Sequence, residues 1–369
     1  MSSTDHTPRT AFLTGSTGFL GAFVLDELLS RTDLTVYALV RAADAGEGMH
    51  RLRSAMAEWN LDIDRLSGRV VPVPGDLSKP LLGMSEAMFG RIAEEADAVF
   101  HAGAHVNFAY PYAALKAANV DGTKEVVRLC VRDHIKRLHH VSAIDAMVQK
   151  GTRAVYEDEP LPQRPIPHGY VQSKWAAERV VAAAEERGLP VTVYRPWLTG
   201  AHSRTGACHT TDYVLRLLRA CLDAGIVPDY EEPLNITPVD FFARSVVHVS
   251  QRADTVGKRF HFANPQDTPL PDIYRWLRSY GHDVDVLPFH TWRDRLVREV
   301  PPASPGYSVL PLIPQHPATE ENRHPRIDLS RTLESTRDAG ITCAPLDERV
   351  IHLELDYLTS IGFLEKPAA

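Results

Sequence analysis

The feature that most constrains the fold is a glycine-rich segment close to the N-terminus. The segment Thr14-Gly15-Ser16-Thr17-Gly18-Phe19-Leu20-Gly21 directly follows an apolar run and opens an amphipathic stretch. A strand, a glycine-rich turn and a helix in this order bring the N–H groups of the helix start against a pyrophosphate. The sequence therefore predicts a βα unit that binds a dinucleotide.

Short apolar runs and amphipathic stretches alternate as far as Pro196. This alternation is typical of a mostly parallel sheet with helices on both faces, a Rossmann-type, doubly wound α/β fold. The predicted strands are Thr10–Thr14, Thr35–Val40, Arg69–Val73, Ala98–His101, Leu138–Ser142 and Val191–Tyr194. The predicted helices are Phe19–Leu29, Tyr112–Asp133 and Gly169–Arg187. We therefore assign residues 1–196 to a dinucleotide-binding domain.

The pattern changes after Pro196, where helical pieces are scattered and the alternation stops. A short strand, Arg259–Phe262, could return to the edge of the sheet, and the proline-rich segment 301–325 is expected to form an irregular loop or a lid. Residues 197–369 are therefore predicted to form a smaller, mainly helical cap that binds the substrate. Its predicted helices are Asp212–Ala224, Val239–Gln251, Pro271–Tyr280 and Leu346–Ile361.

Charge and composition argue against several other classes of protein. Lys and Arg number 40 against 47 Asp and Glu, a net charge of −7, so no overall basic field attracts nucleic acid or an anionic membrane. No apolar run reaches the roughly 18 residues of a membrane span, and the first ten residues lack a secretory signal. The four cysteines form no CxxC pair, and the 17 histidines lack further ligands at metal-binding spacing. We expect a cytoplasmic protein with no metal site.

Residues after the second and third predicted strands bear on which dinucleotide binds. The second strand ends in Arg41, where a NAD site usually has Asp or Glu for the ribose 2′-hydroxyl. A cation there suits a 2′-phosphate, so we expect NADPH; a solvated surface arginine is the alternative interpretation. Arg51 is expected near the same phosphate. Asp76, followed by Leu77, is placed to contact the adenine amino group.

A tyrosine and a lysine stand four residues apart in the predicted helix Gly169–Arg187. The segment reads Tyr170-Val171-Gln172-Ser173-Lys174, which places the phenol and the ammonium on one helix face. A nearby ammonium favours phenolate and is expected to lower the tyrosine pKa, so that Tyr170 acts as an acid or base. The pair follows five strands and a strand end that carries Ser142, which makes it a candidate catalytic centre.

From these residues onward the chain resembles the extended short-chain dehydrogenase/reductases and, more specifically, the thioester reductase family. That family comprises the terminal reductase domains of nonribosomal peptide synthetases and of carboxylic acid reductases. The resemblance spans nearly the whole chain. The motifs that carry it are His101-Ala102-Gly103-Ala104-His105-Val106-Asn107, Pro111-Tyr112, Asn119-Val120-Asp121-Gly122-Thr123, Tyr194-Arg195-Pro196, Gly200, Thr205-Gly206, Asp212, Ile236-Thr237-Pro238-Val239-Asp240 and Gly362-Phe363-Leu364.

The resemblance implies that the chain reduces an acyl thioester with NADPH to an aldehyde, and possible further reduction to an alcohol. The thioester would be held on the phosphopantetheine arm of an acyl or peptidyl carrier protein, or on CoA. Tyr170 would give a proton to the carbonyl oxygen, and Lys174 would also hold the nicotinamide ribose. Further cofactor-binding residues by resemblance are Ala102, Gly103, Ala104, Asn119 and Pro196. Substrate-binding residues by resemblance are Val106, Asn107, Trp197 and Asp212.

Two positions depart from the family pattern. The fifth strand of the family commonly ends in Ser-Thr, and the second residue supplies the third catalytic hydroxyl, whereas this chain has Ser142-Ala143. Three outcomes stay open: Ser142 takes the role, water or the substrate takes it, or redox activity is weakened. Trp197 follows Arg195-Pro196 where the family more often has a small residue, and its indole would narrow the pocket or pack under the cap.

Other functions remain compatible with these residues. An extended reductase could act on a free carbonyl or on a fatty acyl-CoA. A non-redox protein of this fold could catalyse a condensation or keep NADP as a regulatory ligand, because Ala143 leaves the proton relay incomplete. From its starting Met1, and with no attached adenylation or carrier module in the sequence, we expect a discrete enzyme of secondary metabolism.

Overall fold

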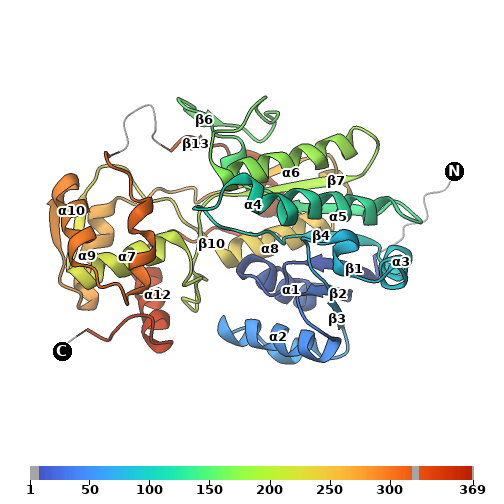
Figure 1. The fold of residues 1–369 in the computed structure, drawn as a ribbon, viewed down its shortest axis with the longest axis horizontal. Helices are drawn as coiled ribbons and strands as arrows, with labels where there is room; N and C mark the ends of the chain where they lie inside the picture. The colour runs from blue at the N-terminus through green and yellow to red at the C-terminus, as the bar shows by residue number, and fades with distance from the viewer. Residues whose placement is uncertain (1–7, 318–323, 368–369) are drawn as a thin grey trace.

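The computed structural model describes residues 8–317 and 324–367, and a parallel sheet forms its centre (Figure 1). Seven strands lie in the order β11-β7-β5-β4-β1-β2-β3, and every neighbouring pair is parallel. Their bounds are β1 Thr10–Thr14, β2 Thr35–Val40, β3 Val70–Pro74, β4 Ala98–His101, β5 Arg137–Val141, β7 Val191–Pro196 and β11 Arg259–Phe262. The strands are buried on both faces, which is why they read as continuous apolar runs. The predicted doubly wound α/β fold is confirmed.

Helices cover both faces of the sheet, and each face has its own apolar core. One face carries α1 Phe19–Arg31, α2 Ala45–Glu58 and α8 Val239–Ser250. The other carries α3 Glu86–Glu95, α5 Gly122–Val131 and α6 Gly169–Glu185. This arrangement leaves the carboxyl ends of the strands open for a ligand, as is usual in sheets of this type.

A second, smaller part of the molecule lies beyond the carboxyl ends of the strands, at the left of Figure 1. It consists of α7 Tyr213–Ala224, β9 Ile226–Asp229, α9 Leu270–Tyr280, β12 Asp285–Pro288, α10 Phe289–Glu299, a 3₁₀ segment Pro305–Leu312 and α12 Glu348–Ser360. We call this part the cap. Between visits to the cap the chain returns to the sheet as α8, as β11 and as α11 Ser330–Arg337, which packs against α8 and β11. Residues after 197 therefore contribute to both parts.

Several helices differ from the sequence prediction. The predicted helix Tyr112–Asp133 is divided into α4 Tyr112–Lys116, a π-helical turn Ala117–Asp121 and α5. The wide turn forms because the Thr123 hydroxyl donates to the Asn119 carbonyl at 2.6 Å, which changes the local hydrogen-bond pattern. The sequence analysis missed α2, whose apolar positions are few and whose first turn is fixed by Asp44 accepting from the Glu47 N–H at 2.9 Å. It also missed α3, α10 and α11.

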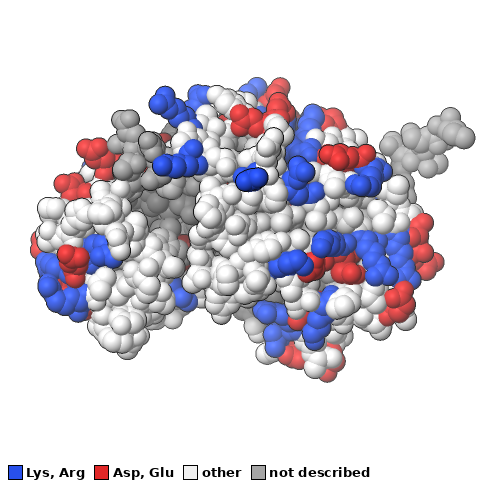
Figure 2. Space-filling model, turned by 45° about the horizontal axis from the view of Figure 1, so that its top comes forward, with Lys and Arg blue, Asp and Glu red and all other residues white. Residues whose placement is uncertain are grey.

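The remaining elements are short. The proline-rich segment contains the 3₁₀ segment Pro305–Leu312, and residues 318–323 lie outside the described part of the chain. No described helix is long and apolar enough to cross a membrane. Acidic and basic side chains are interspersed on the face that Figure 2 presents, and this face is hollowed between the cap and the sheet. The minor strands are β6 Ala154–Val155, β8 Thr199–Gly200, β10 Thr237–Pro238 and β13 Arg326–Ile327.

Candidate active site

The glycine-rich loop joins β1 to α1 and approaches other backbone so closely that only glycine fits. Gly15 has φ +79°, and a Cβ on it would lie 2.6 Å from the backbone nitrogen of Gly103. A Cβ on Gly21 would lie 2.0 Å from the Gly15 carbonyl oxygen. No side chain caps the N-terminus of α1, so its first N–H groups are available to an anion. The loop therefore fits the pyrophosphate of a dinucleotide.

A buried histidine braces this loop from below, and the sequence analysis did not identify it. His101, at the end of β4, bonds through Nδ1 to the Thr14 hydroxyl at 2.7 Å and through Nε2 to the Thr123 hydroxyl at 3.0 Å. The Thr14 oxygen also accepts from the Gly103 N–H at 3.1 Å. Burial lowers the pKa of His101 to about 3, so the ring is neutral and acts as a structural link.

The residues expected at the adenosine end are brought together in part. Arg41 is exposed at the end of β2 and acts electrostatically on Asp76, the residue two positions beyond β3. Although burial alone would raise the pKa of Asp76, hydrogen bonds from Ser78 lower it. Arg51 forms an ion pair with Glu47 one turn earlier on α2, at 2.8 Å. Arg41 is therefore free for a phosphate, whereas Arg51 would have to leave Glu47 first.

Tyr170 and Lys174 lie together on α6, and both are buried. The Lys174 ammonium donates to the Val141 carbonyl at the end of β5, at 2.7 Å. Burial lowers the pKa of Lys174 to about 8, against a smaller opposite effect of Glu178. The pKa of Tyr170 is raised, first by burial and then by the Asp145 carboxylate, which is opposite to the predicted direction. The phenol is therefore held in its protonated form.

Asn119 ties the loop after β4 to α6. Its amide nitrogen donates to the Ser173 hydroxyl at 2.9 Å and to the His105 carbonyl at 3.0 Å, and its oxygen accepts from the His105 N–H at 2.6 Å. The same loop presents Phe108, whose ring centroid is 5.1 Å from that of Tyr170. Phe108 is 40% exposed, so it stands between Tyr170 and solvent. Single residues in irregular loops give no periodic signal, and the sequence analysis missed Phe108.

Ser142 does not lie where the catalytic prediction needs it. Its hydroxyl donates to Glu178, which forms a fully buried ion pair with Arg195 at 2.6 Å. Successive strand residues point to opposite faces, so Ser142 faces this ion pair and Ala143 takes the next position at the strand end. The geometry does not support Ser142 as the third catalytic hydroxyl. The position that the family uses for that hydroxyl is a methyl group here.

Asp145 is a second residue that the sequence analysis missed. It lies in the 3₁₀ turn Ile144–Ala146, two positions after Ala143. Burial raises the pKa of its carboxyl, and His168 and His324 oppose the shift. An acidic group thus stands near the Tyr170 phenol, at the strand end that lacks the expected hydroxyl.

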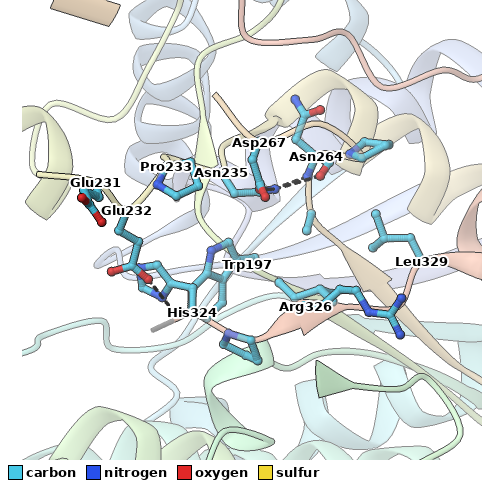
Figure 3. Close-up of a pocket in the computed structure, with 14 residues that line it drawn as sticks. Trp197, Glu231, Glu232, Pro233, Asn235, Asn264, Asp267, His324, Arg326 and Leu329 are labelled. Atoms are coloured by element: carbon cyan, nitrogen blue, oxygen red, sulfur yellow. Dashed lines mark hydrogen bonds and ion pairs between the residues drawn. The ribbon is translucent and has the colours of Figure 1, made fainter. Parts of the chain in front are cut away.

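Beside this strand end is a cavity of about 360 Å³, which we call the Trp197 cavity (Figure 3). The backbone N–H of Trp197 donates to the Phe262 carbonyl at 2.7 Å, and the centroid of the Trp197 ring lies 5.0 Å from that of His324. Trp197 also packs against a small apolar cluster that contains Ile144 and Met147. The cavity is lined by Trp197, Glu231, Glu232, Pro233, Asn235, Ala263, Asn264, Pro265, Asp267, His324, Pro325, Arg326, Ile327 and Leu329.

The other residues expected to bind substrate lie elsewhere. Asp212 caps α7 by accepting from the Val214 N–H at 2.8 Å and lines a separate cavity of about 20 Å³. The Asn107 side chain accepts from the N–H groups of Ala109 and Tyr110, so it shapes the loop after β4. Val106, in the same loop, is 55% exposed. Among the described residues no cluster of three His, Cys, Asp or Glu side chains could hold a metal ion.

Comparisons of sequence identify relatives of the chain. A family model described as male sterility protein matches residues 13–246. A linear gramicidin synthase of Brevibacillus parabrevis is 36% identical over 362 residues, which are 96% of this chain and 7% of that protein. Isonitrile lipopeptide synthase of Streptomyces coeruleorubidus is 35% identical over 374 residues, 98% of this chain and 25% of the synthase. The chain thus spans a minor part of the length of these relatives.

Comparisons of structure agree with the sequence. The terminal R domain of the myxalamid PKS-NRPS biosynthetic pathway is 40% identical with a TM-score of 0.94, over 99% of this chain and 94% of that one. The reductase domain of a nonribosomal peptide synthetase from Mycobacterium tuberculosis is 26% identical with a TM-score of 0.86, over 97% and 93%. Fold and site thus define an oxidoreductase that binds a nicotinamide dinucleotide. The chain belongs to the male sterility protein family and, within it, to the terminal reductase domains, which confirms the predicted family.

Proposed function

We propose that the chain reduces a carrier-bound or CoA-bound acyl thioester to an aldehyde with NADPH. The observation that carries the proposal is the position of Tyr170 and Lys174, buried at the carboxyl end of the sheet between the glycine-rich loop and the Trp197 cavity. Arg41, exposed and without an ion-pair partner among residues 8–317 and 324–367, supports NADPH over NADH.

The residues of the chain divide the chemistry between them. When bound, NADPH supplies the hydride for the thioester carbon. Tyr170 donates its proton to the carbonyl oxygen as negative charge develops there, and its raised pKa means that the proton is present at neutral pH. Lys174 holds the nicotinamide ribose hydroxyls and stabilises the phenolate that remains. The hemithioacetal then releases the thiol and leaves the aldehyde.

The loop after β4 and the cap supply access and exclusion of water. Phe108 covers the Tyr170 ring and shields the reacting carbonyl from solvent. The pantetheine arm of a carrier protein enters past this loop. A cytoplasmic location follows from the soluble carrier proteins that such an enzyme serves.

The test is a reductase assay with purified protein, NADPH and a panel of acyl-pantetheine and acyl-CoA thioesters. We expect loss of NADPH absorbance and an aldehyde, or the corresponding alcohol, by mass spectrometry. A condensed or cyclised product with NADPH unspent would contradict the proposal and favour a non-redox activity, which the methyl group of Ala143 in place of a hydroxyl would tolerate. Equal rates with NADH would contradict the role of Arg41.

A further inference from the structure

The Trp197 cavity has an unbalanced charge. Its lining contains the carboxylates of Glu231, Glu232 and Asp267 and a single guanidinium, that of Arg326. The Arg326 guanidinium is already engaged, because it donates to the Tyr156 hydroxyl at 3.1 Å and lies 6.0 Å from the centre of that ring. Figure 3 shows its head on the side of the cavity away from Glu231 and Glu232. Arg326 therefore does not neutralise the acidic side of the cavity.

Glu232 is the member of this set whose charge is most exposed to the ligand and least to water. Its side chain is only 9% exposed, and it accepts from the backbone N–H of His324 at 2.6 Å and from the Tyr230 hydroxyl at 2.8 Å. Both donors are neutral, and the His324 imidazole, 3.9 Å away, is charged only when protonated. No Lys or Arg of the described residues is within ion-pair distance of Glu232. A buried carboxylate normally has a permanent cationic partner, and the volume of the cavity is where that partner would fit.

Trp197 provides a second feature that suits a cation. Its indole is half-buried in the wall of the cavity, between the acidic side and the end that holds Arg326 and Leu329 (Figure 3). Indole faces attract ammonium groups more strongly than other aromatic rings do, and the attraction increases when water is excluded. Trp197 also contacts the apolar cluster after Ala143, so a ligand on it is close to the catalytic strand end.

We propose that the Trp197 cavity binds the acyl part of the thioester and selects acyl chains that carry a positively charged ammonium group. This inference rests on the proposed function, because it names the substrate class of the same reaction. The carboxylates also repel phosphate, so the phosphate end of the pantetheine arm or of CoA lies outside this cavity. Glu232 and Asp267 bind the cation, and Trp197 covers it.

The inference can be tested with two thioesters of the same shape and different charge. The pair is 6-(trimethylammonio)hexanoyl-pantetheine and 7,7-dimethyloctanoyl-pantetheine, which differ by a charged nitrogen in place of a carbon; neither can form a lactam. Adipoyl-pantetheine supplies the anionic case. We expect kcat/KM for the cationic thioester to exceed that for its neutral isostere by at least about ten-fold, with the anionic thioester slowest.

Variants separate this inference from the proposed function. Glu232→Gln keeps an acceptor for the His324 N–H and should reduce the ratio of cationic to neutral kcat/KM towards one; Asp267→Asn should reduce it less. Glu94→Gln, which removes the same charge from the exposed face of α3, is the control and should leave the ratio unchanged. Equal kcat/KM for the cationic and neutral thioesters, with both reduced, would overturn the inference and leave the function standing. No reduction of any thioester would overturn the function itself.

Discussion

The dinucleotide side and the substrate side of the site are built in different ways. The dinucleotide side is one contiguous segment, Thr14–Gly21, whose shape is set by backbone that approaches backbone. The Trp197 cavity is assembled from side chains of four segments that are far apart in sequence, around residues 197, 231–235, 263–267 and 324–329. Backbone geometry tolerates few residue types, whereas a lining of side chains can change one residue at a time. The cofactor is therefore fixed by the fold, and the acyl chain is set by residues that vary freely.

The largest effect is expected where the two sides meet. Tyr170→Phe should lower turnover by at least about a hundred-fold with little change in NADPH affinity, because the phenol acts on the carbonyl oxygen and not on the dinucleotide. Steady-state kinetics and a fluorescence titration with NADPH measure the two quantities. Normal turnover of the variant would move the proton donor elsewhere, with Asp145 the nearest acidic group.

A second effect, of about 2 kcal/mol, is expected in the core of the cap. Glu354 on α12 is 6% exposed, and burial, with Asp212 adding to it, raises its pKa to about 7. Because the folded pKa is above the unfolded value, this carboxyl favours folding less and less as the pH rises from about 4.5 to 7. Glu354→Gln should therefore increase the free energy of unfolding at pH 8 by about 2 kcal/mol and change it little at pH 4.5. Urea denaturation at both pH values measures this, and an equal change at both would exclude the titration.

A third effect concerns the dinucleotide side alone. Arg41→Ala should remove most of a preference of at least about ten-fold for NADPH over NADH, because the variant loses a charge-assisted bond to the 2′-phosphate. Arg51→Ala should have a smaller effect, since Arg51 is paired with Glu47. Titration of each variant with both cofactors distinguishes them. A preference that survives Arg41→Ala but not Arg51→Ala would reverse the assignment.

The smallest effect is expected at the end of β5. Ala143→Thr should raise the reductase rate several-fold by restoring a donor to the developing oxyanion. Ser142→Ala should leave the rate within a few-fold and lower stability by about 1–3 kcal/mol, because Glu178 loses a buried hydrogen bond. Single-turnover rates and thermal unfolding measure the two variants. A sharp loss of rate in Ser142→Ala would show that its hydroxyl leaves Glu178 during the reaction.

The sequence predicted those parts of the molecule that depend on local pattern. The strands from Thr10–Thr14 to Val191–Pro196 and the glycine-rich loop follow from apolar periodicity and from glycine spacing. The cavity carboxylates, Phe108 and Asp145 could not be predicted, because their proximity to Tyr170 or Trp197 depends on how distant loops pack. The expected direction of the Tyr170 pKa was wrong for the same reason. Helical spacing places an ammonium nearby but does not show that burial outweighs it.

The path of the chain between sheet and cap has a consequence for protein engineering. After β7 the chain enters the cap as α7, returns to the sheet as α8 and β11, enters the cap again as α9 and α10, and visits the sheet once more as α11 before it ends in α12. A chimera that joins the first 196 residues to the cap of another reductase would lose β11 and two sheet-covering helices together with the cap. A new acyl specificity is therefore better introduced by exchanging short inserts, each bounded by sheet elements that stay in place.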